Sequence, residues 1–201
     1  MNDKAADAWR RVAEAGHSGD EATARESLSS SDPVLRELAL GALTRMGALT
    51  DGDLRGAFSD QAYTVRRRAA MLAAKRRDIS LIELLRDSND SVVEAAAWAC
   101  GEHEVVSEEE FTRLVALATD AGEPLVRESA IAALGAIGDL RGLPAILAGC
   151  ADKPAIRRRA VLALAPFSGP QVDAALQAAL QDRDWQVRQA AEDLSPRPAV
   201  D

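Results

Sequence analysis

Five arginines recur at one point of a repeating pattern, and they are the most regular candidates for chemistry in this chain of 201 residues. They are Arg36, Arg66, Arg127, Arg157 and Arg188. A guanidinium is a planar fork of hydrogen-bond donors that suits a phosphate or a carboxylate. The row could bind phosphates, or each arginine could bind an acidic or carbonyl group of the adjacent repeat. Ligand groups are seldom repeated evenly along a whole array, so we expect the second arrangement, a structural ladder.

Two denser basic clusters raise the same question. Arg66–Arg68 with Lys75–Arg77 form one cluster, and Arg157–Arg159 form the other. They could contact phosphates, or they could be solvated charge combined with the ladder. The net charge of −8 argues against a general binder of nucleic acid or anionic membranes, for which a basic excess is expected. We therefore favour the structural interpretation and expect neither a nucleic-acid partner nor a membrane.

Other reactive residue types are sparse. The chain has two histidines, His17 and His103, and no G-x-S-x-G or G-x-x-x-x-G-K-[ST] motif. Cys100 and Cys150 are typical of buried apolar thiols in a reducing compartment. The sequence therefore predicts no catalytic residue, no metal site, no cofactor and no enzymatic activity.

A repeated helix must position these side chains. If the hydrophobic residue before each ladder arginine is position zero, the six copies are spaced by 30, 27, 34, 30 and 31 residues. They start at Leu35, Val65, Val92, Val126, Ile156 and Val187. Positions zero, four, seven and eight are small or apolar, which places them on one stripe of a helix. Position four is alanine in every copy, from Ala39 to Ala191, which predicts close approach of neighbouring helices.

The helix boundaries are also marked. Proline lies two residues before position zero in three copies, at Pro33, Pro124 and Pro154. Expected N-caps are Asp32, Asn89, Asp184 and Ser107, the last in a capping box with Glu110. Glycines expected at or near helix ends, where glycine accepts left-handed geometry, are Gly47, Gly101, Gly135, Gly138 and Gly169. We also expect a short helix over residues 79–85.

The pattern of Val126-Arg127, Ala130 and Ala133-Leu134-Gly135 resembles the short HEAT repeat first described in bilin lyases of phycobilisomes. The resemblance extends from about residue 20 to residue 195. The repeat period of about 30 residues is shorter than the ~40–47 residues of longer HEAT units. It implies an all-α, right-handed α-solenoid of about six HEAT-like helix pairs. We expect a single domain over 1–201, with an N-terminal capping helix in 1–19, repeats in 20–195 and a tail in 196–201.

The ends of the chain and its composition lead to further expectations. Position five is apolar in five copies but Glu192 in the sixth, which predicts that the array ends there. The N-terminus lacks the apolar segment of a signal peptide, and no run of 18 apolar residues follows, so we expect a cytoplasmic protein. We also expect the protein to be a monomer. The composition, rich in Ala, Arg and Asp, favours a bacterial source.

In HEAT-like proteins the second helix of each pair lines a concave surface. The resemblance implies that the side chains at positions two, six and nine point into that groove. We predict that Met71, Trp98 and Leu162 form an apolar strip that holds a peptide or helix of a partner protein. The charged residues bordering this strip are Arg67, Glu94, Glu128 and Arg158. The alternative is that Trp98 packs against an adjacent repeat and fills a gap.

Enzymatic alternatives come from other HEAT-like proteins. A bilin lyase, or one of its subunits, is the first, and an alkylpurine DNA glycosylase is the second, although no catalytic Asp or aromatic pair matches the latter. Deoxyhypusine hydroxylase holds two irons with several His-Glu pairs, whereas this chain offers only His103-Glu104, too few ligands for such a site. Because fold does not fix function, we expect a non-enzymatic scaffold for protein binding.

Overall fold

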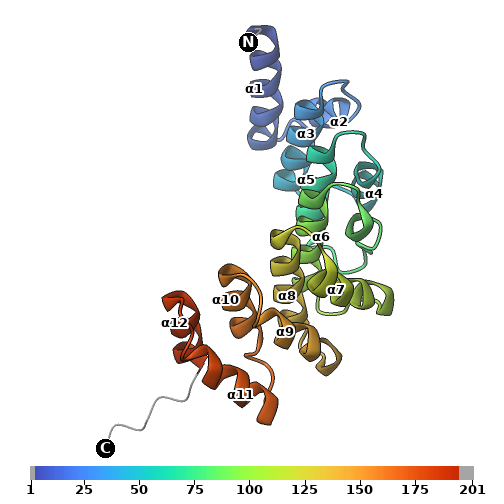
Figure 1. The fold of residues 1–201 in the computed structure, drawn as a ribbon. Helices are drawn as coiled ribbons and strands as arrows, with labels where there is room; N and C mark the ends of the chain where they lie inside the picture. Colours follow the sequence, from blue (N-terminus) through green and yellow to red (C-terminus); the bar gives the residue numbers. More distant parts are fainter. Residues whose placement is uncertain (1–2, 195–201) are drawn as a thin grey trace, which may run out of the picture.

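Residues 3–194 are described by a computed structural model, in which they form twelve α-helices, two short 3-10 helices and no β-strand. The helices stack into a curved α-solenoid, as the sequence predicted (Figure 1). One helix of each pair lies in an inner row on the concave side, and its partner lies in an outer row. The tail predicted for residues 196–201 falls outside the described residues.

The inner row begins at an N-terminal helix, α1 (Asp3–Ser18), which packs against α2 and α3. The inner helices are α3 (Pro33–Met46), α5 (Tyr63–Ala73), α6 (Asp90–Gly101), α8 (Pro124–Ile137), α10 (Pro154–Ala163) and α12 (Trp185–Leu194). The outer elements are α2 (Glu21–Ser27), α4 (Asp51–Phe58), η1 (Leu84–Arg86), α7 (Glu108–Asp120), η2 (Leu140–Gly142), α9 (Leu143–Gly149) and α11 (Pro170–Ala179). Each inner helix contacts the next one along the stack.

The alanine at position four is the reason why the inner helices stack closely. All six, from Ala39 to Ala191, are fully buried. One large cluster of buried Ala, Leu, Val and Ile side chains runs through the stack, and a smaller one lies where α10, α11 and α12 meet. A larger side chain at position four would separate neighbouring helices and leave voids, because protein interiors are close-packed.

Most of the predicted helix boundaries are confirmed. Pro33, Pro124 and Pro154 each begin an inner helix. The side chains of Asp32, Asn89 and Asp184 accept hydrogen bonds from backbone amides two residues further on. Ser107 and Glu110 form the expected capping box at the start of α7.

The helix predicted over residues 79–85 is wrong. That segment contains turns and ends in the 3-10 helix η1, although Leu81 and Leu84 are fully buried. The spacing between repeats two and three is also the shortest, at 27 residues, so little chain is left for a regular outer helix. The Leu81 amide donates to Glu110 Oε1 at 2.6 Å instead of to a helical carbonyl. Glu110 therefore takes the place of helical hydrogen bonding in this segment.

Two glycines have a different role from the predicted one. Gly47 and Gly138 end α3 and α8 in left-handed geometry with φ of 70°. Gly101 is the last residue of α6 and Gly135 lies two residues before the end of α8, but neither has left-handed geometry. A Cβ on Gly135 would lie 2.7 Å from Ala163 Cα, and one on Gly101 would lie 3.0 Å from Ala133 Cα. They allow the next inner helix to approach closely. Gly169 has a φ of 117° and precedes α11 rather than ending a helix.

We predict that Gly135→Ala lowers the free energy of unfolding by about 2 kcal/mol, because the new methyl group meets the backbone of α10. The matched control is Gly56→Ala in α4, where a Cβ meets nothing within 4 Å. That substitution is expected to raise stability by about 0.5–1 kcal/mol, because alanine loses less conformational entropy in a helix. Urea denaturation of both variants measures the difference. Equal effects would show that α8 and α10 are not in close contact at Gly135.

Candidate functional site

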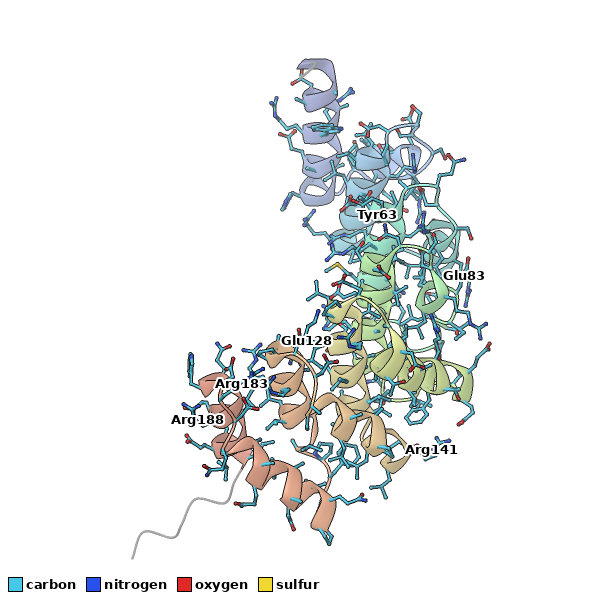
Figure 2. All side chains as sticks on the ribbon, viewed as in Figure 1. Tyr63, Glu83, Glu128, Arg141, Arg183 and Arg188 are labelled. Atoms are coloured by element: carbon cyan, nitrogen blue, oxygen red, sulfur yellow. The ribbon has the colours of Figure 1, made fainter. Side chains whose placement is uncertain are left out.

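The concave side of the solenoid carries most of the exposed large apolar side chains. Among the described residues there are eight such side chains, and six of them belong to inner helices. The six are Val34, Tyr63, Trp98, Leu125, Leu162 and Trp185. Figure 2 shows Glu128 on this concave side, whereas Glu83 and Arg141 lie on the outer side. The concave side is therefore the candidate functional surface, here called the inner face.

The predicted apolar strip is only partly continuous. Trp98 is 42% exposed, so it does not fill a gap between repeats. Leu162 is also exposed, but Met71 is half-buried and packs against the core. Arg67 is exposed, and Glu94, Glu128 and Arg158 are half-buried. These are the residues predicted to form the site, and all of them lie on inner helices.

The structure adds residues that the sequence did not single out. Tyr63 is 48% exposed and Trp185 is 65% exposed, and both lie two residues before position zero. Proline occupies that position in three other copies. An aromatic residue where other copies have proline was the sequence signal that could have identified these two positions. Leu125, one residue before position zero, is exposed in the same region.

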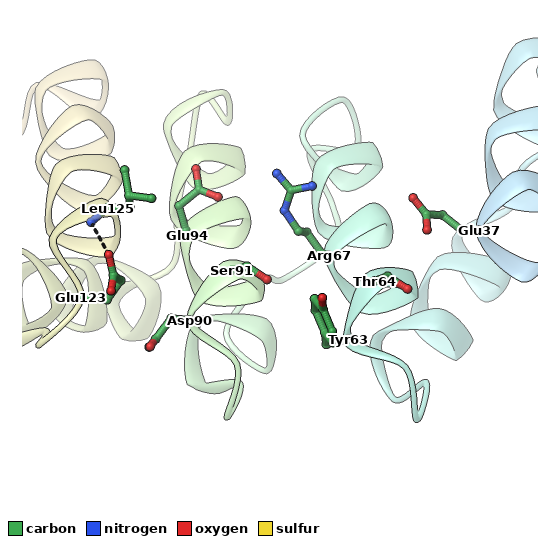
Figure 3. A pocket seen from close by; sticks show the side chains of 9 residues that line it. All are labelled: Glu37, Tyr63, Thr64, Arg67, Asp90, Ser91, Glu94, Glu123 and Leu125. Carbon is green, nitrogen blue, oxygen red and sulfur yellow. Dashed lines mark hydrogen bonds between the residues drawn. The ribbon is translucent and has the colours of Figure 1, made fainter. Parts of the chain in front are cut away.

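The inner face is hollowed at two separate places. The first hollow, here called the acidic pocket, lies across α3, α5, α6 and α8 and has a cavity volume of about 550 Å³ (Figure 3). Its lining residues are Glu37, Tyr63, Thr64, Arg67, Asp90, Ser91, Glu94, Glu123 and Leu125. It therefore combines four carboxylates, one guanidinium, one phenol ring and one leucine.

The second hollow lies between α10 and α12 and has a cavity volume of about 230 Å³. Arg158, Leu162 and Trp185 line it. The structure thus places Arg67 and Glu94 at one hollow and Arg158 and Leu162 at the other, while Trp98, Met71 and Glu128 line neither. The predicted site residues share one face without converging on a single cavity.

Of the five arginines at position one, all but Arg188 donate to an aspartate carboxylate of the next repeat. Arg36 donates two hydrogen bonds to the Asp60 carboxylate, at 2.7 and 2.6 Å, and Arg66 does the same to Asp87, at 2.6 and 2.8 Å. Arg66 also donates to the backbone carbonyl of Asp60 at 2.8 Å. Asp60 therefore joins the arginine of the preceding repeat to that of its own repeat, whereas Asp87 binds one arginine, Arg66. In the C-terminal part of the ladder, Arg127 donates to the Asp152 carboxylate and Arg157 donates to the Asp182 carboxylate. Arg157 and Arg188 also donate to the backbone carbonyls of Asp152 and Asp182, respectively.

The arginines change the acidity of their partners. The hydrogen bonds from Arg66 lower the pKa of the Asp87 carboxyl below its usual value, even though burial acts in the opposite direction. Arg36 lowers the pKa of Asp60 in the same way. These carboxylates are thus ionised at neutral pH and engaged inside the protein, so they are not available for acid–base chemistry.

The ladder is interrupted between repeats three and four. Position one of repeat three is Val93, which is buried, and the residue five before position zero of repeat four is Ala121 rather than aspartate. Both charged partners are therefore replaced together. This avoids a lone charge in a largely desolvated position, which would be costly.

The basic clusters are divided among different structural partners. In the first, Arg66 belongs to the ladder, Arg76 donates to the Leu49 carbonyl at 2.6 Å, and Arg77 donates to Glu104 at 2.7 Å. In the second, Arg157 belongs to the ladder and Arg159 lies 3.4 Å from Glu128. The clusters do not present one continuous row of free guanidinium groups.

The histidine and cysteine side chains that catalysis or metal binding could use also have structural roles. His103 is buried and its Nε2 lies 3.0 Å from the Ala73 carbonyl, to which it donates. Burial raises the pKa of the Cys150 thiol to about 11, and it raises that of Cys100 further. Both thiols are protonated at neutral pH, which is unfavourable for a nucleophile. Within residues 3–194, no group of three or more His, Cys, Asp or Glu side chains is placed to hold a metal ion, and no helix has the length and apolar character needed to cross a bilayer.

Three solved structures share this architecture. An engineered protein has a TM-score of 0.64 at 20% identity, covering 87% of this chain and 96% of its own. A designed armadillo repeat protein in complex with the peptide (KR)4 has a TM-score of 0.60 at 18% identity, covering 84% and 95%. The Escherichia coli protein YibA has a TM-score of 0.60 at 19% identity, covering 77% of this chain and 60% of its own. At such identities these likenesses show the fold alone.

Sequence comparison identifies the family. A search among curated proteins gives no match to this sequence. The model of HEAT repeats matches in three overlapping windows, residues 50–135, 79–165 and 111–194, which together span well over half of the chain. They cover the pairs from α4 to α12, and the resemblance noted in the sequence is thereby confirmed. The chain belongs to the family of HEAT-repeat proteins.

Proposed function

We propose that this protein is a non-enzymatic scaffold that binds a segment of a partner protein on its inner face, as a single copy and without a cofactor. One observation carries the proposal: six of the eight exposed large apolar side chains among the described residues lie on the inner helices. Such a concentration on one face exceeds the scattered exposure of single apolar residues that is normal on protein surfaces.

The residue types also suit protein recognition. Trp98 and Trp185 are exposed, and tryptophan is among the residues that most often dominate interface energies, with truncation costing about 2 kcal/mol or more. Arg67 and Arg158 border the apolar side chains. The designed armadillo repeat neighbour was solved with a peptide, which supports peptide binding by this architecture.

A nucleic-acid ligand fits the inner face less well. The acidic pocket contains four carboxylates and one guanidinium, and the chain has a net charge of −8. Phosphates would be repelled there. The partner is therefore proposed to be a protein, which also disfavours the DNA-glycosylase alternative.

The proposal is tested with two variants that add the same charge at different places. Trp98→Glu with Leu162→Glu changes two exposed apolar residues of the inner face. Val105→Glu with Leu140→Glu changes two exposed apolar residues outside the inner helices and serves as the control. Each protein, with the wild type, is used to capture partners from a lysate of the source cells, and mass spectrometry identifies what is retained.

We expect a protein that the wild type and the control retain and the inner-face variant loses, with about a hundredfold loss of affinity once it is purified. Circular dichroism establishes that all three baits are folded. If the inner-face variant retains the same partners as the wild type, the inner face is not the binding surface. An eluate dominated by nucleic acid would contradict the scaffold function itself.

A further inference from the structure

The charges of the inner face are unevenly distributed and largely unpaired. The acidic pocket at α3, α5, α6 and α8 holds Glu37, Asp90, Glu94 and Glu123. Within residues 3–194, no ion pair or side-chain hydrogen bond engages Glu37, Asp90 or Arg67. This differs from the ladder, where each aspartate carboxylate accepts two hydrogen bonds from one arginine. Glu94 accepts a hydrogen bond from the Ser129 hydroxyl and Glu123 accepts one from the Leu125 amide, both at 3.4 Å, so among the described residues no cation pairs with the excess negative charge of the pocket.

Apolar side chains border the same carboxylates. Figure 3 shows Tyr63 next to Arg67 on α5, with Asp90 and Glu94 on the adjoining helix α6. Leu125 lies on the far side, at the start of α8. Tyr63 and Leu125 are both exposed. The face of an aromatic ring attracts cations, and this attraction adds to that of nearby carboxylates.

We propose that the inner face binds a partner segment in which lysine or arginine side chains alternate with aliphatic ones. The basic groups enter the acidic pocket beside Tyr63 and pair with Glu94 and Asp90. The aliphatic groups lie on Leu125 and on Trp98 further along α6. This inference rests on the proposed function and specifies the chemistry of its partner.

Charge complementarity selects this partner over others. An acidic segment would meet four carboxylates and only one guanidinium. A wholly apolar segment would leave the charges of the pocket desolvated without partners, which is costly. A basic segment satisfies the carboxylates, and a cavity of about 550 Å³ is large enough to take its side chains.

The test uses three fluorescently labelled peptides that share the same leucine positions. Their remaining positions are all lysine, all glutamine or all glutamate. Fluorescence anisotropy measures their binding to the folded full chain at about 0.15 M salt, where interactions beyond about 8 Å are screened. The pocket variant is Asp90→Asn with Glu94→Gln. The control is Asp173→Asn with Glu26→Gln, two exposed residues of outer helices that give the same change of net charge.

We expect the lysine peptide to bind at least about tenfold more tightly than the glutamine peptide and the glutamate peptide to bind weakest. The pocket variant should lose about tenfold in affinity for the lysine peptide, while the control stays within about twofold of the wild type. An equal loss in both variants would attribute the binding to net charge and overturn the inference. Failure of the lysine peptide to bind would overturn it as well.

The peptides also separate this inference from the proposed function. If the lysine and glutamine peptides bind equally and Trp98→Ser weakens both, the inner face binds apolar segments without regard to charge. The inference then fails and the proposed function stands. If lysine-peptide binding depends on the pocket but Trp98→Ser has no effect, the inference stands without its contact at Trp98.

Discussion

Replacing Arg66 by valine is expected to lower the free energy of unfolding by about 3 kcal/mol, at the lower end of the cost of breaking a buried ion pair. The Asp87 side chain is only 8% exposed, and it would keep its charge after losing two hydrogen bonds from the guanidinium. The Asp60 carbonyl would lose a donor as well. Equilibrium denaturation in urea measures the loss.

The interrupted step of the ladder suggests the matched control. Valine and alanine stand at Val93 and Ala121, where a paired step of the ladder has arginine and aspartate. Arg66→Val combined with Asp87→Ala copies that arrangement. We expect the double variant to recover about 1–2 kcal/mol of the loss, because no unpaired charge remains. Recovery stays incomplete because Asp87 also accepts a hydrogen bond from the Asn89 amide. A double variant less stable than Arg66→Val would show that the pair is not the source of the effect.

Glu110→Gln is the second substitution with a large expected effect, again about 3 kcal/mol. Oε1 of Glu110 accepts from the Leu81 amide and the Ser80 hydroxyl, and Oε2 accepts from the Ser107 amide and hydroxyl. In glutamine one of these oxygens becomes an NH2 group, which faces a backbone N–H in either orientation. At least one buried donor then lacks an acceptor.

This effect depends on pH. Burial raises the pKa of Glu110, but hydrogen bonds from Ser107, Leu81 and Ser80 outweigh it, so the net pKa lies below the usual value. The carboxylate therefore stabilises the fold above its unfolded pKa of about 4.3, and this contribution is lost as the pH falls through the folded pKa. The difference between wild type and Glu110→Gln should be full at pH 7 and shrink below about pH 4. Glu109→Gln, at a 59% exposed side chain, is the control and should change stability by less than about 0.5 kcal/mol. A difference that does not depend on pH would contradict the role of the charge.

The repeat architecture could be predicted from the sequence because its causes are local. Proline at the first helical position and the Asp or Asn caps act within a few residues, and the alanine at position four recurs in every copy, so the pattern of one copy predicts the next. Residues 79–85 were predicted incorrectly because their hydrogen bonds depend on a distant residue, Glu110, some 29 residues further along. The close approach at Gly135 depends in the same way on where α10 lies.

The candidate site could be predicted only in part. Helical periodicity identified Trp98 and Leu162 as residues of the inner face. It did not identify Tyr63 or Trp185, because the first helical turn was considered only for its role in capping. Nor could it divide the face into two hollows, since the shape of a groove depends on how successive helices are rotated against each other. That rotation is a property of packing between repeats.

The interruption of the ladder also determines how this array could grow or shrink. Repeats joined by an arginine and an aspartate have matching edges, so a copy of repeat five, from Asp152 to Arg157 and onward, could follow itself with every edge paired. The edge between Val93 and Ala121 accepts only its own apolar counterpart. By the same rule only repeats two, five and six, which carry both an aspartate and an arginine, could be duplicated or lost with every remaining edge paired. The array therefore consists of two blocks of three repeats, each linked internally by charge pairs, that meet at one apolar step.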